Sequence, residues 1–125
     1  MPQIADSVFD AGLATITAGG TKIDICETSE PANFAGIAAL TLGNKAGLTT
    51  GAATDNTPTG RKVVVPAITD GAVTKDGTAA YWALSNGTDT LYASGPMTGG
   101  GQAVTNGNTF TLDAIDIAIL DATAV

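Results

Sequence analysis

The spacing of apolar residues predicts one helix at the start of the chain. Residues 6–18 place apolar side chains on a single helical face: Phe9, Leu13 and Ile16. Ser7 and Asp10 have the spacing of a capping box, and Gly19-Gly20 is typical of a helix end. We therefore expect a helix over 6–18 that is capped by Asp6 or Ser7 and packs its apolar face on a core.

From residue 21 onward the pattern changes to short apolar or alternating segments. The segments expected to be strands are 21–27, 61–68, a short one from Val73, 78–85, 90–94 and 110–120, with a possible edge strand at 45–49. The dipeptides expected to form turns are Asp70-Gly71, Asp76-Gly77, Asn86-Gly87 and Asn106-Gly107. Residues 32–42 fit either a short helix or a loop that lies on the core. Short strands joined by such turns predict a mainly β fold, an antiparallel β-sandwich or small barrel with one N-terminal α-helix.

Alternation also assigns side chains to faces within these strands. In 21–27, Ile23 and Ile25 share one face, and Cys26 lies on the other face with polar neighbours. In 78–85, Trp82 and Leu84 share a face, and the remaining apolar side chains of that strand lie opposite. The phase of 110–120 shifts in the middle, which predicts a bulge near Asp113.

Composition narrows the class of protein. The chain has 125 residues, the usual size of one domain, and we expect a single domain over 1–125. Only 14% of the residues are charged, against about a quarter in typical domains. A surface of small and hydroxyl side chains suits assembly proteins, because little charge must be desolvated when subunits pack. An ordinary β protein with an uncharged surface is the simpler alternative.

Charge disfavours two classes of partner. The net charge is −7 and there are five Lys and Arg residues in total, so neither a nucleic acid nor an anionic membrane is an expected partner. The N-terminus lacks a basic region followed by an apolar run, so we expect synthesis in the cytoplasm without a cleavable secretion signal. A single cysteine, Cys26, excludes a disulfide within the chain.

The sequence holds no recognisable catalytic or cofactor motif. There is no histidine, no nucleophile elbow and no phosphate-binding loop, so we expect no enzyme activity and no cofactor. Asp113, Asp116 and Asp121 could form an oxygen-rich cation site, but solvated strand residues are the simpler interpretation. Trp82 is either part of the core or a binding platform. Arg61 and Lys62 form the only adjacent basic pair, either a contact with an acidic neighbour or the solvated start of a strand.

The order of segments along nearly the whole chain gives a family resemblance. The segments that carry it are Asp6–Leu13, Lys22–Cys26, Ser29-Glu30-Pro31, Leu42–Lys45, Thr59–Val65, Gly77–Leu84 and Asp113–Ile117. Together they resemble small proteins encoded among the virion genes of tailed bacteriophages and prophages. The motifs are short and consist of common residues.

This resemblance implies a virion structural protein, most naturally a capsid decoration (cement) protein on the outer surface of the head. The implied partners are the major capsid protein and further copies of the chain, as a trimer, and the implied location is the capsid surface. The residues expected to contact a partner are Gln3 and Ile4 in an N-terminal arm, together with Arg61 and Lys62. The N-terminal helix departs from the family habit of a flexible starting arm.

Three other functions remain open. A tail or tail-fibre module would read cell-surface sugars through exposed loops such as Gly95–Gly101. A carboxylate-based glycan hydrolase would need two carboxylates facing each other across a cleft, roughly 5–10 Å apart. A free-standing binding domain in the cytosol would remain monomeric and would not bind phage particles.

Overall fold

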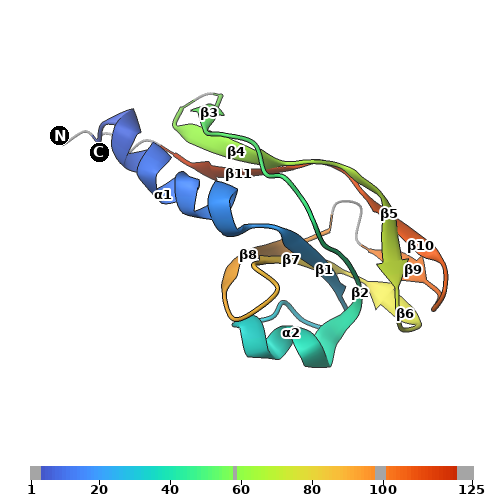
Figure 1. Ribbon diagram of the computed structural model, residues 1–125. Coiled ribbons are helices and arrows are strands. Elements are labelled where there is room, and N and C mark those ends of the chain that lie inside the picture. The colour runs from blue at the N-terminus through green and yellow to red at the C-terminus, as the bar shows by residue number, and fades with distance from the viewer. Residues whose placement is uncertain (1–3, 58, 98–100, 121–125) are drawn as a thin grey trace.

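The protein consists of two helices and antiparallel sheets (Figure 1). The computed structural model describes residues 4–57, 59–97 and 101–120. Helix α1 spans Asp6–Gly19, and a shorter helix, α2, spans Phe34–Leu40. The segment 32–42, which fits either a helix or a loop by sequence, therefore contains a helix. Its N-cap is Asn33, whose side-chain Oδ1 accepts a 2.9 Å hydrogen bond from the amide of Gly36.

The largest sheet has six antiparallel strands in the order β10-β5-β2-β1-β7-β8. Their bounds are β1 Lys22–Cys26, β2 Thr41–Lys45, β5 Ile68–Val73, β7 Tyr81–Ser85, β8 Leu91–Pro96 and β10 Thr109–Leu112. A three-stranded sheet has the order β11-β4-β3. Its strands are β3 Thr54–Asp55, β4 Arg61–Val65 and β11 Ile115–Ile119. The last two strands, β6 Gly77–Ala79 and β9 Gln102–Val104, pair with each other.

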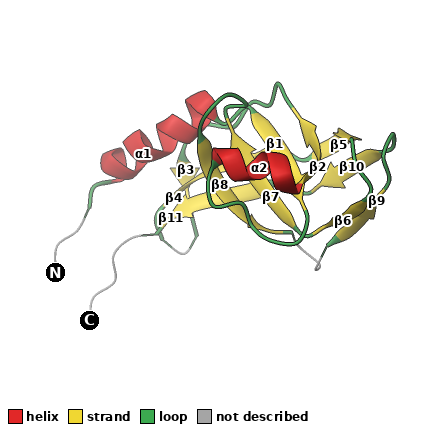
Figure 2. Ribbon diagram, turned by 90° about the horizontal axis from the view of Figure 1, so that it is seen from below, coloured by secondary structure: helices red, strands yellow, loops and turns green. Residues whose placement is uncertain are grey.

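These sheets confirm the predicted class, a mainly β, sandwich-like fold with an N-terminal helix. The main core takes buried side chains from all three sheets: Ile23, Ile25, Leu42, Val65, Ile68, Val73, Ala79, Leu84 and Phe110. A smaller core lies under α2 on the other face of the large sheet, where Ile37 packs with Cys26 and Ala83 (Figure 2). The predicted faces of strands 21–27 and 78–85 are thus correct.

Helix α1 and the three-stranded sheet form one end of the molecule (Figures 1 and 2). Phe9 and Leu13 are the buried residues of the helix. Because β11 and β4 are paired with Ile119 opposite Arg61, these two side chains share the sheet face on which α1 lies. Lys62 and Asp116 lie on the opposite, outer face of the sheet.

The predicted cap of the first helix is wrong. The N-cap residue is Ala5, which makes no side-chain capping bond, and the first turn is closed by the amide of Val8 donating to the carbonyl of Ala5. Neither Asp6 nor Ser7 serves as the cap. Asp10, the second residue of the expected capping box, instead bonds to Arg61. A tertiary ion pair therefore replaces the local capping bond.

Two of the four predicted turns are confirmed, a third is displaced because Gly77 already begins β6 and the connection from β5 is 74–76, and the fourth is wrong. Asn86-Gly87 and Asn106-Gly107 lie in turns, with positive φ at both glycines. Asp70-Gly71 instead lies inside β5, paired with β10. Gly71 is needed there because the ring of Phe110 covers it: a Cβ on this residue would lie 2.2 Å from the ring.

Three strand bounds also differ from the sequence-based prediction. The expected edge strand at 45–49 is wrong: residues 46–49 form no strand, and β2, Thr41–Lys45, ends where it was expected to begin and lies inside the large sheet. The expected strand 61–68 breaks after Val65, and Ile68 begins another strand in a different sheet. Likewise the segment 110–120 is two strands, β10 and β11, and the predicted bulge is the crossing between sheets.

Candidate interaction surface

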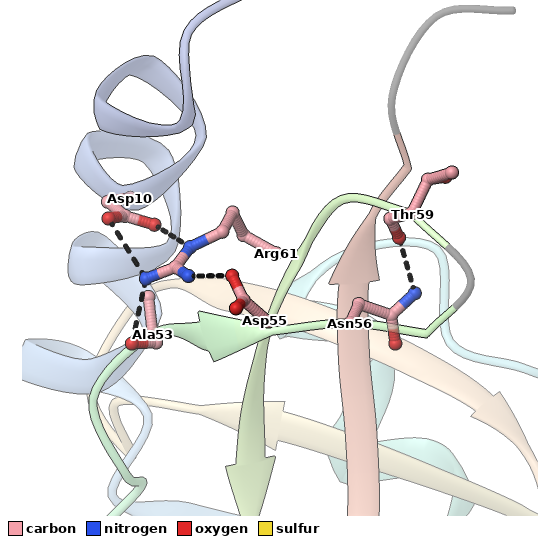
Figure 3. A network of polar contacts seen from close by, with 6 residues as sticks. All are labelled: Asp10, Ala53, Asp55, Asn56, Thr59 and Arg61. Carbon is pink, nitrogen blue, oxygen red and sulfur yellow. Dashed lines mark hydrogen bonds and ion pairs between the residues drawn. The ribbon is translucent and has the colours of Figure 1, made fainter.

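The guanidinium group of Arg61 fixes α1 to the small sheet (Figure 3). Its Nε donates a 2.8 Å hydrogen bond to Oδ1 of Asp10 on the helix, and its Nη1 donates to Asp55 on β3. Nη2 donates to Oδ2 of Asp10 at 3.3 Å and to the carbonyl of Ala53 at 3.3 Å. The two carboxylates raise the pKa of Arg61, chiefly through these hydrogen bonds. The arginine side chain is 18% exposed, so this network is part of the structure of this end.

The predicted partner-contact residues therefore divide into two groups. Arg61 and Lys62 contact acidic neighbours within their own chain, since Lys62 Nζ lies 3.1 Å from Oδ2 of Asp116. Ile4 is exposed, at 48%. Gln3 lies outside the described residues. Among the three of these residues that the structure describes, Ile4 is the one whose side chain is open to a partner.

An exposed apolar patch lies at this same end and is formed by Ile4, Val8, Ile119 and Leu120. Val8 is 60% exposed, Leu120 61% and Ile119 36%. A Cβ on Gly12 would lie 3.7 Å from Cδ1 of Ile119, so β11 reaches the helix one turn after Val8. Ile4 lies just before the helix, next to its N-cap residue Ala5. We call these four exposed side chains at one end of the molecule the apolar patch, although alternation along β11 directs Leu120 away from the face on which Ile119 meets α1.

The exposed face of α1 beyond Asp10 adds no charge to this end. Its exposed residues are all small: Ala11, Gly12, Ala14, Thr15 and Ala18. An open groove of about 350 Å³ runs along one side of the helix, lined by Asp10, Ala14, Thr17 and Ala18 and by Ala52 and Ala53. Apart from Asp10, which pairs with Arg61, the described residues that line this groove are uncharged.

A second hollow, of about 150 Å³, lies beside Trp82. Among the described residues, its polar side chains are those of Gln102, Thr111 and Asp113, and Met97 and Leu112 supply part of the apolar wall. Trp82 is half-buried and packs against the main core. From the sequence, this tryptophan is either a core residue or a binding platform. In the structure it packs on the core and also lines the hollow.

Two of the three ionisable side chains of β1, Asp24 and Cys26, are buried on the face of the large sheet that α2 covers. Cys26 is fully buried, and this burial, with the nearby Asp24 charge, raises the pKa of the thiol to about 12. The thiol is thus held in its unreactive protonated form. Asp24 is also buried and accepts a 2.8 Å hydrogen bond from Oγ1 of Thr41. Burial raises the pKa of Asp24, opposed by this bond and by the Lys22 charge.

Replacing Asp24 by asparagine is expected to stabilise the protein at pH 7. Because the folded-state pKa is raised, the native state binds more protons than the unfolded state just above pH 3.8, and stability falls as the pH rises through that window. The neutral amide would remove this loss while still accepting the Thr41 bond. Urea unfolding at several pH values should show a gain at pH 7 that shrinks on acidification. Asp113→Asn, at an exposed carboxylate, is the control, and a less stable Asp24→Asn variant at pH 7 would contradict the interpretation.

The predicted cation site is tested only in part, because Asp121 lies outside the described residues. Asp116 pairs with Lys62, and the described part of the chain brings no three His, Cys, Asp or Glu side chains together as metal ligands. Within the same residues, neither helix has the length and apolarity to cross a bilayer. Comparison of the chain with protein-family models, curated proteins and solved structures found no match.

Proposed function

We propose that the chain is a structural protein of a tailed-bacteriophage virion, most simply a capsid decoration protein that binds the outer surface of the head and stabilises it. Its partner is then the major capsid protein, and its location is the capsid surface. The chain acts as a trimer in this role. The resemblance of its segments to small virion proteins gives the proposal, and the apolar patch is the structural observation that supports it.

The patch supports an assembly role because of its size and setting. Four large aliphatic side chains are exposed at one end, next to a helix face of small, uncharged residues. Single exposed apolar residues are common, but grouped ones usually mark a surface that another molecule covers. The Arg61 network holds the helix and sheet that carry the patch together, so the surface is built before any partner arrives.

Binding to empty heads tests this function. Purified protein is mixed with undecorated heads assembled from the major capsid protein encoded in the same genome, and uptake is measured by sedimentation. Saturable, stoichiometric uptake and a higher disassembly temperature of the heads are expected. Analytical ultracentrifugation of the free protein tests the trimer. Absence of uptake at saturating protein would overturn the decoration role.

The hollow beside Trp82 favours a second candidate, a sugar-binding module of the tail. A tryptophan with an amide and a carboxylate beside the same hollow is an arrangement suited to a sugar. Trp82 is the only tryptophan, so its fluorescence reports on this hollow directly. Titration with glucose, galactose and N-acetylglucosamine should leave the emission unchanged if the hollow is not a sugar site. A saturable change, lost in Gln102→Ala, would promote the tail function.

Among the described residues that line this hollow, Asp113 is the single carboxylate. Glycan hydrolysis ordinarily uses two, roughly 5–10 Å apart. The lining therefore favours binding over hydrolysis at this position. Release of reducing sugars from cell-wall glycan is the assay that would restore the hydrolase alternative.

A further inference from the structure

We propose that Asn106 is a site of spontaneous chemical modification, at which water replaces the side-chain amide and leaves an aspartate or isoaspartate. The structure protects the other Asn-Gly pair of the chain, Asn86-Gly87, from the same reaction. The modification depends on the turn that carries Asn106 and needs no partner, so it goes beyond the proposed virion function and does not depend on it.

The reaction joins two groups of the Asn106-Gly107 pair. The backbone nitrogen of Gly107 gives its proton to hydroxide and attacks Cγ of Asn106. A nitrogen–carbon bond forms, the bond from Cγ to Nδ2 breaks, and Nδ2 leaves as ammonia after taking a proton from water. One water molecule then opens the cyclic imide at either carbonyl, which gives aspartate or, with a methylene added to the main chain, isoaspartate. Glycine favours the attack because it has no side chain to hinder its nitrogen, and every asparagine outside the two Asn-Gly pairs is followed by a residue with a side chain.

The side chain of Asn86 is held by the loop that leads into β8. Its Oδ1 accepts hydrogen bonds of 2.9, 2.9 and 3.0 Å from three successive backbone amides, those of Thr88, Asp89 and Thr90. Its Nδ2 donates a 2.9 Å bond to Oδ1 of Asp89. Because these bonds fix the amide in one orientation, the side chain cannot swing toward the nitrogen of Gly87 without breaking them.

The side chain of Asn106 is exposed and makes no hydrogen bond within the described residues, although its backbone amide donates to Oδ1 of Asp76 at 2.7 Å. The two reacting nitrogens are held alike. That of Gly107 donates to the carbonyl of Val73 at 3.0 Å, and that of Gly87 donates to Oγ of Ser85 at 3.1 Å. The difference between the two Asn-Gly pairs therefore lies in the asparagine side chain, which is free to turn only at Asn106.

Modification at this turn should loosen the start of β10. The turn is closed by the amide of Asn108, which donates to the carbonyl of Thr105 at 3.0 Å. It also bonds to both backbone groups of Val73 on β5, through the amide of Gly107 and, at 3.1 Å, the carbonyl of Asn108. Isoaspartate inserts a methylene into this turn and so displaces the groups that bond to Val73. Either product also adds a carboxylate to a residue whose amide already binds Asp76.

Peptide mapping tests the selectivity. The folded protein is incubated at mildly alkaline pH, and samples are denatured, digested and analysed by mass spectrometry for the mass increase that marks conversion of an amide to an acid. Chymotrypsin cleaves after Tyr92 and separates the two pairs, whereas trypsin would leave both on one peptide because no Lys or Arg follows Lys75. We expect Asn106 to react about tenfold or more faster than Asn86, because breaking the Asn86 hydrogen bonds adds to its barrier.

The protein unfolded in urea is the matched control. Both side chains lose their contacts there, so the two pairs should react at similar rates. Three results would overturn the proposal: equal rates in the folded protein, faster reaction at Asn86, or an Asn106 that reacts in urea and stays intact in the folded protein. A preference for Asn106 that persists unchanged in urea would assign it to the local sequence and overturn the protection of Asn86 by the fold.

Two variants test the effect on β10. The acidic form that accumulates on ageing is isolated by ion exchange, its isoaspartate content is measured by peptide mapping, and its urea midpoint is compared with that of fresh protein. We expect a lower midpoint for the aged form, and a smaller decrease for Asn106→Asp, which adds the charge without lengthening the main chain. Asn106→Gln should keep the midpoint of fresh protein and accumulate no acidic form over the same time. An aged form as stable as fresh protein would overturn the predicted loosening of β10.

Discussion

Replacing Phe110 by alanine is expected to lower the free energy of unfolding by about 3–5 kcal/mol, as truncation of a fully buried phenylalanine does in other cores. The ring is 1% exposed and is among the largest fully buried side chains of the protein. It extends from the edge strand β10 and covers Gly71 on β5. The cavity left by its removal lies in the core, over Gly71, where the paired backbones of β5 and β10 limit how far the structure can collapse. Urea unfolding followed by circular dichroism measures the change.

A double-mutant cycle with Gly71 gives this prediction a control. Gly71→Ala alone should be strongly destabilising, because its Cβ would lie 2.2 Å from the Phe110 ring. In the Phe110→Ala background the same change should cost little, since the ring is gone. A coupling energy near zero between the two sites would show that the ring does not cover Gly71 in solution.

Gly60→Ala is the second substitution expected to have a large effect. Gly60 has φ +89°, and a Cβ there would lie 2.0 Å from the carbonyl oxygen of Ile119, a backbone atom that cannot rotate away. The residue lies in the turn that leads into β4, beside the end of β11. The substitution should therefore both strain the turn and displace the strand that carries Ile119 and Leu120.

Gly107→Ala is the matched control, because Gly107 has the same φ of +89° and has no atom within 4 Å of an added Cβ. Its free energy of unfolding should fall only by the conformational cost of placing a residue with a Cβ at a left-handed position, about 1–2 kcal/mol. The free energy of unfolding of Gly60→Ala should fall by about 1–3 kcal/mol more than this, the range typical of overpacking. Equal losses measured by urea unfolding would contradict the close packing of Gly60 against β11.

The sequence predicts local structure well wherever one local signal decides it. The Asn-Gly turns are confirmed, and so is the alternation that separates Trp82 and Leu84 from the other face of their strand. Asp70-Gly71 looks the same locally as these turns. It forms part of a strand because Phe110, 39 positions away by residue number, packs against the glycine. Only the tertiary structure distinguishes the two cases.

The candidate surface is harder to predict for the same reason. Ile4 is predicted to contact a partner because it lies in an expected N-terminal arm, and Arg61 is predicted to do so because of its charge. The pairing of Arg61 with Asp10 joins positions 51 residues apart, and the capping-box spacing indicates a local role for Asp10 instead. Val8, Ile119 and Leu120 come together only because β11 packs beside α1. Their one sequence signal is that each lies at the margin of an apolar run.

The orientation of the bound protein tests the central claim most directly. Cryo-electron microscopy of heads saturated with the protein would show which end of the molecule meets the shell. The α1 end of the molecule is predicted to lie against the capsid surface, with Val8 covered and α2 facing solvent. Well-defined density with α1 and β11 directed away from the shell would contradict the account.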